Sequence, residues 1–219
     1  MTNRIIQVNG KDVVKHQIGR FDGLNCFVEV LDSMVYGERP RFIFRFIKYD
    51  LNSKGDSKYT NDISIYMDYD KADAFAAMIL SGTFARLKLQ AQKDGNNQLY
   101  HTMGGTTKES LASQKRSRTD NMDESRQMFV EAGIKSAFAM KAMLGPGKRD
   151  EKGLIVPQYL PNKAEQQVII AFTDETFIAF ARTIQRKVNA MDVLEESKWQ
   201  KELKAFEEKK KKEFEQNKK

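Results

Sequence analysis

Residues 41–49 alternate cationic or aromatic side chains with apolar ones. Successive residues of a strand point to opposite faces, so three phenylalanines share one side. They are Phe42, Phe44 and Phe46. The other side carries Arg41, Arg45 and Tyr49 beside two isoleucines. We expect the phenylalanines to face a core, which leaves a partly exposed basic and aromatic surface. Proteins hold single-stranded nucleic acid with such cations and rings, which contact phosphates and stack on bases.

Two further residues extend this surface. Apolar side chains alternate with polar ones at residues 63–67, which places Tyr66 on the outward side of a second strand. If that strand pairs with residues 41–49, Tyr66 lies near Arg45. Lys141 occupies the matching place in the second half of the chain. We therefore expect two similar patches, across which one flexible strand of nucleic acid can lie.

A long polar segment supplies additional cations. Residues 104–125 show no apolar period, and a loop of this length inside a compact domain is usually functional or disordered. We expect a flexible arm whose Lys115, Arg116 and Arg118 contact phosphates. A solvated linker with incidental charge is the equally weighted alternative.

A second basic segment is expected to form a turn at residues 145–150, between the strand that ends at Leu144 and the apolar residues 154–156. Its two cations, Lys148 and Arg149, either clamp a nucleic-acid backbone or face water. The glycines of this turn resemble a phosphate cradle. They lack the helix start that would direct backbone amides at a phosphate.

The sequence contains no convincing enzyme constellation. It lacks the glycine-rich phosphate loops, the His-Glu-x-x-His pair and the Gly-x-Ser-x-Gly elbow. One cysteine, Cys26, and two scattered histidines do not suit thiol or zinc chemistry. Asp68 and Asp70 suit a magnesium site for phosphoryl transfer, but helix capping accounts for Asp70 more simply. We predict a non-enzymatic protein with no cofactor and no metal; magnesium-dependent turnover would favour the alternative.

An internal repeat indicates how these residues are positioned. Residues 63–79 reappear, with substitutions, as residues 168–184, about 105 positions later. Four identities mark the match: Ala74 with Ala179, Phe75 with Phe180, Ala76 with Ala181, and Ile79 with Ile184. In each copy an alternating apolar pattern changes to a spacing of three and four, which predicts a strand followed by a helix. We expect Asp70 and Asp174 to cap the two helices.

The repeat continues upstream with different loop lengths. Residues 26–30 match residues 128–132, and residues 41–48 loosely match residues 137–144. The sequence therefore predicts an α+β fold of two pseudo-repeats, 1–94 and 95–190, each with four antiparallel strands followed by a helix. Together they form one domain. A charged helical tail at 191–219 extends from it and is available for a protein partner, although a solvated helix end is slightly favoured.

Composition narrows the class of protein. The chain has 219 residues, a net charge of +7, 40% hydrophobic residues and 31% charged residues. No apolar run approaches the roughly 20 residues that span a bilayer. The start has no apolar segment of signal-peptide length, so we expect a cytoplasmic protein that does not bind membranes. The positive charge favours acidic partners such as nucleic acid.

This arrangement resembles the whirly family of single-stranded-DNA-binding proteins. The likeness covers residues 3–188 and consists of the element order, strand-strand-strand-strand-helix twice over, with basic and aromatic strands. The plant signature Lys-Gly-Lys-Ala-Ala-Leu is absent, so no functional residue is carried over from the family. The resemblance implies two roughly perpendicular sheets, a homo-oligomer that is a ring-like tetramer in the family, and binding with little sequence preference.

The sequence therefore predicts a protein that binds single-stranded DNA, with RNA also admitted. A role in replication, recombination or repair, in a phage or mobile element, would suit this chemistry. The main alternative is a scaffolding or oligomerisation protein that does not bind nucleic acid, in which the positive charge serves solubility.

Overall fold

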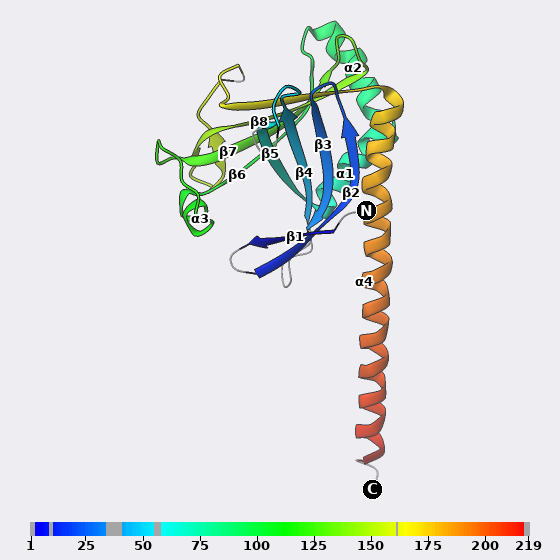
Figure 1. The fold of residues 1–219 in the computed structure, drawn as a ribbon. Helices are drawn as coiled ribbons and strands as arrows, with labels where there is room; N and C mark the ends of the chain where they lie inside the picture. Colours follow the sequence, from blue (N-terminus) through cyan, green and yellow to red (C-terminus); the bar gives the residue numbers. More distant parts are fainter. Residues whose placement is uncertain (1–2, 9–10, 34–40, 55–57, 161, 217–219) are drawn as a thin grey trace.

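The computed structural model describes residues 3–8, 11–33, 41–54, 58–160 and 162–216. It contains two antiparallel sheets (Figure 1). Sheet A comprises β1 (Asn3–Val8), β2 (Lys11–Asp22), β3 (Cys26–Ser33), β4 (Arg41–Tyr49) and β5 (Tyr59–Asp68). Sheet B comprises β6 (Gln98–Thr106), β7 (Asp123–Ala132), β8 (Phe138–Arg149), β9 (Ile155–Pro157) and β10 (Gln166–Phe172). The helices are α1 (Tyr69–Leu80), α2 (Thr83–Asp94), α3 (Lys108–Ser113) and α4 (Asp174–Gln216).

The order of the elements confirms the predicted fold class. β2 to β5 form a meander that leads into α1, and β6, β7, β8 and β10 form a second meander that leads into α4. β1 adds an edge strand to sheet A, and β9 pairs with the end of β8. The sequence analysis did not predict β1, and it placed the apolar residues 154–156, where β9 starts, after the expected turn without including them in either four-strand repeat.

Strand register supports the repeat in detail. Arg45 pairs with Ser64 between β4 and β5, and Lys141 pairs with Ile169 between β8 and β10. These are matching positions of the two halves, because residues 41–48 match residues 137–144 and residues 63–79 match residues 168–184. The β3–β4 ladder is shifted by two residues relative to the β7–β8 ladder, because Arg45 lies opposite Glu29 whereas Lys141 lies opposite Phe129.

One apolar core joins the two halves. The apolar faces of both sheets, of α1 and of the first part of α4 pack into it. Equivalent helix positions 105 residues apart are all buried: Ala72 and Phe177, Phe75 and Phe180, Ala76 and Ala181, Ile79 and Ile184. As predicted, Phe42, Phe44 and Phe46 of β4 also point into the core. Each half therefore buries its apolar face against the other, which neither half could do by itself.

The helix starts differ from the prediction. Asp68 takes the N-cap position of α1 without a side-chain cap, and Asp70 lies in the first turn. Thr173 precedes α4 and caps it: the Thr176 amide donates to Thr173 Oγ1 at 3.2 Å, and the Thr173 amide donates to Thr176 Oγ1 at 2.9 Å. Asp70 and Asp174 instead place negative charge in the first turn, where the helix dipole favours it.

A buried ion pair fastens α4 to sheet A. Lys187 Nζ lies 2.7 Å from Asp32 Oδ2, and the Tyr69 hydroxyl donates to Asp32 Oδ1 at 3.0 Å. Since Asp32 is almost fully buried, removing Lys187 would leave a charge without compensation. The cluster therefore fixes α1 and α4 on the same edge of the core.

Two segments that the sequence analysis assigned to loops are ordered. The proposed arm at 104–125 contains the end of β6, the helix α3 and the start of β7. The proposed turn at 145–150 is mostly strand, because β8 continues to Arg149 and pairs with β7 and β9. Pairing on both sides of β8 explains how a segment rich in glycine and proline remains extended. Among the described residues no helix is long and apolar enough to cross a membrane.

Candidate nucleic-acid interface

The outward side of β4 and β5 carries most of the candidate residues, and we call it the β4–β5 face. Its members are Arg41, Arg45, Tyr49, Lys58, Tyr59 and Tyr66. Tyr49 and Tyr59 are direct partners across the two strands, so their side chains point to the same side. Tyr59 and Tyr66 have exposed fractions of 54% and 50%. Two rings on one strand are thus accessible to a stacking ligand.

The guanidinium of Arg45 is held by carboxylates at the centre of this face. It donates from Nε and Nη2 to Asp62 at 2.9 and 2.5 Å, and Nη1 lies 3.6 Å from Glu29. The hydrogen bonds that Arg45 donates to Asp62, and then the charges of Asp62 and Glu29, raise the pKa of Arg45 despite partial burial. Arg45 is a pre-oriented cation with a carboxylate in the place where a phosphate would bind.

Arg41 is the more accessible arginine of the β4–β5 face. Its Nε donates to Asp68 at 3.0 Å, and the side chains of both residues are about half exposed. A surface ion pair of this kind contributes little free energy and exchanges readily. The carboxylate that pairs with Arg41 belongs to Asp68, one of the two candidate magnesium ligands of the sequence analysis. Among the described residues, no group of three or more histidine, cysteine or acidic side chains is placed to hold a metal ion.

Arg126 connects the β4–β5 face to sheet B. Its guanidinium carbon lies 5.8 Å from the centre of the Tyr66 ring, within reach of a cation–π contact. Arg126 also bonds to Glu124, and Glu124 accepts from Arg116 Nη2 at 2.8 Å. The predicted residues Tyr66 and Arg116 are therefore brought together, through a pair of residues that the sequence analysis missed. Arg126 is buried within β7, and nothing in a single sequence indicates that it contacts Tyr66.

Lys141 is placed on the outward side of sheet B, away from the contacts of the β4–β5 face. It bonds to Glu131 and lies 5.1 Å from the centre of the Phe129 ring. His101 stacks on the same ring, with centroids 4.4 Å apart and planes 8° from parallel. Phe27, which matches Phe129 in the repeat, has Arg20 3.7 Å from its ring centre. Each sheet therefore covers an outward phenylalanine with a cation.

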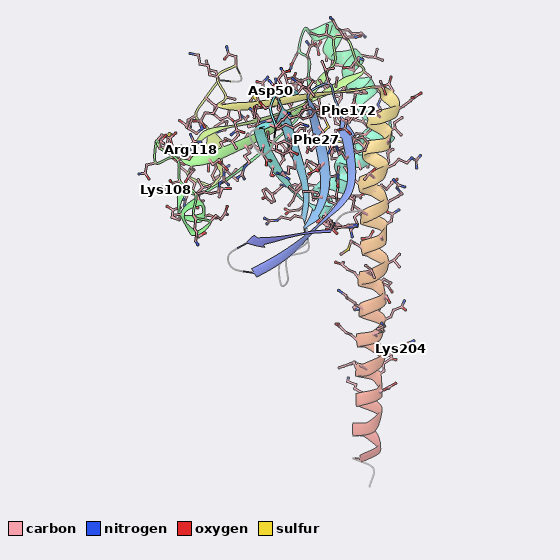
Figure 2. The ribbon with its side chains drawn as sticks, viewed as in Figure 1. Phe27, Asp50, Lys108, Arg118, Phe172 and Lys204 are labelled. Atoms are coloured by element: carbon pink, nitrogen blue, oxygen red, sulfur yellow. The ribbon has the colours of Figure 1, made fainter. Side chains whose placement is uncertain are left out.

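The other predicted clamps form part of the ordered end of sheet B. Arg118 donates to Asp120 and to Glu165, with Nη2 at 2.7 and 2.6 Å respectively, and only 10% of its side chain is exposed. The hydrogen bonds that Arg118 donates, first to Glu165 and then to Asp120, raise the pKa of Arg118. In Figure 2, Arg118 and Lys108 lie at the end that carries α3, away from Phe27 of sheet A. Arg118 thus ties residues 118–120 to residue 165, as a structural contact.

The remaining three cations differ from one another. Arg149 Nη2 donates to Glu109 at 2.8 Å, which links β8 to α3. Lys115 and Lys148 are exposed, and within the part of the chain that the structure describes neither makes a salt bridge. Lys115 has a positive φ of 56° at the end of α3. Both lysines are accessible, but no described contact joins them to the β4–β5 face.

Charge on the β4–β5 face and its immediate neighbours is balanced rather than basic. Five described cations contact or belong to it: Arg20, Arg41, Arg45, Lys58 and Arg126. Five described carboxylates pair with them or lie beside them: Asp22, Glu29, Asp62, Asp68 and Glu124. The sequence analysis considered the arginines of one strand, whereas the carboxylates come from its neighbours on both sides. The predicted excess of positive charge is therefore absent from this face.

Two residues of the face were missed: Tyr59, because β5 starts earlier than the apolar pattern at residues 63–67 indicates, and Lys58, which immediately precedes that strand. Lys58 Nζ lies 5.2 Å from the centre of the Tyr49 ring. A bulge at Lys48 and Tyr49 changes the β4–β5 register there, so a strict alternation counted back from Tyr66 would have turned Tyr59 inward.

Comparison with protein-family models, curated proteins and solved structures gives no match to this chain.

Proposed function

We propose that the protein binds single-stranded nucleic acid, DNA in the first place, on the β4–β5 face and with little sequence preference. The observation that carries this proposal is the pair of half-exposed rings, Tyr59 and Tyr66, on one strand beside Arg41 and Arg45. Every base has a π-face, so stacking on tyrosine discriminates little between sequences. The seven residue-to-residue steps from Tyr59 to Tyr66 span about 23 Å of strand, enough to contact several nucleotides.

The ion pairs of the face determine how phosphates would bind. A guanidinium binds carboxylate and phosphate with the same two-pronged geometry, so a backbone phosphate competes with Asp62 for Arg45. The carboxylate orients the arginine before binding, at the expense of part of the electrostatic gain. We therefore expect stacking to supply a large share of the affinity. The salt dependence then reflects few phosphate contacts, about 0.7 in log–log slope for each one.

The biological setting proposed for this activity is DNA replication, recombination or repair, by a homo-oligomer that needs neither metal nor cofactor. The whirly resemblance supports it through element order, and the repeated four-strand meanders followed by helices are consistent with that order. The same chemistry admits RNA. No catalytic step is part of the proposal.

A second candidate function, self-assembly without nucleic-acid binding, is favoured by one specific observation. The arginines Arg20, Arg41 and Arg45 are each paired with a carboxylate, as expected of a surface that only needs to be soluble. The two candidates make opposite predictions for an oligonucleotide titration, whatever the oligomeric state.

Fluorescence anisotropy with a labelled, unstructured DNA oligonucleotide tests the proposal. At 50–100 mM salt we expect saturable binding that weakens as salt is added. Arg45→Gln and Tyr66→Ala should each reduce affinity, whereas Lys93→Gln, a charge change in the last turn of α2 away from the face, should not. Binding that is absent at low salt, or is equally weakened by Lys93→Gln, would exclude the β4–β5 face.

A further inference from the structure

The last helix continues far beyond the domain that it helps to form. Among the residues of α4 whose burial the structure describes, Met191 is the last buried one, and the helix extends from there to Gln216. Figure 1 shows this part projecting well past both sheets, and Figure 2 places Lys204 on it. At 1.5 Å per residue the projecting part is about 38 Å long. We call residues 192–216 the tail.

The tail keeps the apolar face by which α4 packs on the domain. At about 100° per residue, the buried Val188 and Met191 and three tail residues fall within an arc of about 120°. The three tail residues are Trp199, Leu203 and Phe206, with exposed fractions of 57%, 38% and 55%. We call them the tail stripe. Large apolar side chains aligned on one face of a helix are typical of a surface that is covered by another helix.

Val193 is an apolar tail residue that lies off the tail stripe and offers a comparison. Val193 is 69% exposed, and helical geometry places it about 110° from the centre of the tail stripe. A substitution there changes an apolar residue on the same helix that is more exposed than those of the tail stripe. Its effect separates general changes in tail solubility from loss of a specific contact.

Charge is distributed unevenly along the tail. Asp192, Glu195 and Glu196 lie near its start, whereas the four lysines at 209–212 lie near its end, among the glutamates at 207, 208, 213 and 215. Glu196 and Lys210 are each seven residues from Leu203, which is about 10 Å along the axis in opposite directions. Both lie within about 55° of the centre of the tail stripe. Glu196 and Lys210 therefore lie beside the same apolar face at equal distances on either side of Leu203.

This symmetry identifies the partner and its direction. If two identical tails run parallel, Glu196 faces Glu196 and Lys210 faces Lys210, which is repulsive at both ends. If they run antiparallel about Leu203, Glu196 of each copy lies level with Lys210 of the other. The same alignment brings Trp199 of one copy within about one residue of the level of Phe206 in the other. Aromatic and charge complementarity therefore select the same arrangement.

We propose that the tails of two copies of this chain pair antiparallel through Trp199, Leu203 and Phe206, centred on Leu203, and hold two domains at opposite ends of a helical pair. The proposal does not depend on nucleic-acid binding, since the tail stripe shares no residue with the β4–β5 face. The partner of the tail stripe is thus the tail of a second copy, whose Lys210 lies level with Glu196 of the first.

Sedimentation equilibrium of the full-length chain tests the contact. We expect wild type to have at least twice the 25.2 kDa mass of one chain at micromolar concentration. Leu203→Glu should weaken this association at least about tenfold, since loss of a central contact commonly exceeds 1.4 kcal/mol, and Val193→Glu should leave it unchanged. A monomeric wild type, an unaffected Leu203→Glu variant, or an equal loss in Val193→Glu would overturn the proposal.

Two further readouts test burial and direction. Trp199 is the only tryptophan of the chain, so its emission should shift to shorter wavelength as concentration rises; an unchanged emission would contradict burial between tails. For direction, full-length Trp199→Cys and Phe206→Cys chains are mixed and oxidised. Antiparallel pairing predicts a disulfide between the two variants and little within Trp199→Cys alone. Predominant 199–199 linkage would overturn the arrangement, and wild type, whose one cysteine is buried, is the control.

Discussion

Phe75 and Phe180, which occupy matching positions in the two halves of the chain, meet in the core with ring centroids 6.4 Å apart and planes at 84°. Edge-to-face contact between aromatic rings adds to the free energy of burying them. The residues that reveal the repeat in the sequence are thus the residues that join the two halves. Element order and strand register repeat because both helices serve one shared core.

Phe180→Ala should lower the free energy of unfolding by about 3–5 kcal/mol, because the ring is fully buried and also contacts Phe21, Phe44 and Phe172. Near-ultraviolet circular dichroism in urea is the suitable measurement, since the single tryptophan lies in the tail. Leu89→Ala on the exposed side of α2 should change stability by less than about 0.5 kcal/mol. Two separate transitions for the two halves would contradict a shared core.

The repeated segments were predictable because their apolar residues recur with strand and helix periods and are all buried. The ordered segments around α3 and at the end of β8 were not, because their order depends on contacts between distant residues. Arg118 with Glu165 and Arg149 with Glu109 are such contacts. The glycines and proline at the end of β8 suggest a turn, and the sequence does not show that β7 and β9 pair with this segment.

The candidate interface was predictable in part, for a similar reason. Alternation within each of two strands correctly placed Arg41, Arg45 and Tyr66 on an outward side. It could not reveal that Asp62 and Asp68 stand opposite the arginines, because that depends on the register of the neighbouring strand. A sequence indicates which residues share a face more readily than which of them neutralise each other.

Tyr66→Ala should weaken oligonucleotide binding about tenfold, within the roughly 1–3 kcal/mol that stacking on one aromatic ring contributes. Tyr66→Phe keeps the ring and should retain affinity within about twofold, because the hydroxyl is not required for stacking. Anisotropy titrations of both variants at one salt concentration make the comparison. Equal loss in the phenylalanine variant would indicate a hydroxyl contact and contradict the stacking role.

Asp62→Asn should increase affinity and steepen the salt dependence, because it releases Arg45 from its bidentate carboxylate. If Arg45 then contacts one phosphate, the log–log slope should grow by about 0.7. Asp94→Asn makes the same charge change at the end of α2 and serves as the matched control. Unchanged binding by Asp62→Asn, or the same gain in Asp94→Asn, would show that Arg45 does not contact the ligand.

Stability should decline in alkaline solution because three partly buried tyrosines resist ionisation. Burial raises the pKa of Tyr69, with a further contribution from Asp32, and burial also raises the pKa of Tyr100 and Tyr159. An unfolded tyrosine ionises near pH 10, so the stabilisation is complete below about pH 10 and is lost as pH rises toward the folded-state values.

Urea unfolding at pH 8, 10 and 11 measures this effect. Tyr100→Phe should reduce the fall in unfolding free energy between pH 8 and 11, because it removes one group with a raised pKa. Tyr66→Phe, a change at a half-exposed residue, is the comparison. A stability that rises above pH 10 would have the opposite sign to the one derived from these shifts.

The most direct test of the central claim is an anisotropy titration of wild type and of Tyr59→Ala/Tyr66→Ala, each with single-stranded DNA, the same sequence as a duplex, and single-stranded RNA. We predict that wild type prefers the single strands to the duplex, because only unpaired bases can stack on the two rings, and that the double variant loses this preference. Equal affinity of wild type for duplex and single strand, or an undiminished preference in the double variant, would contradict the account.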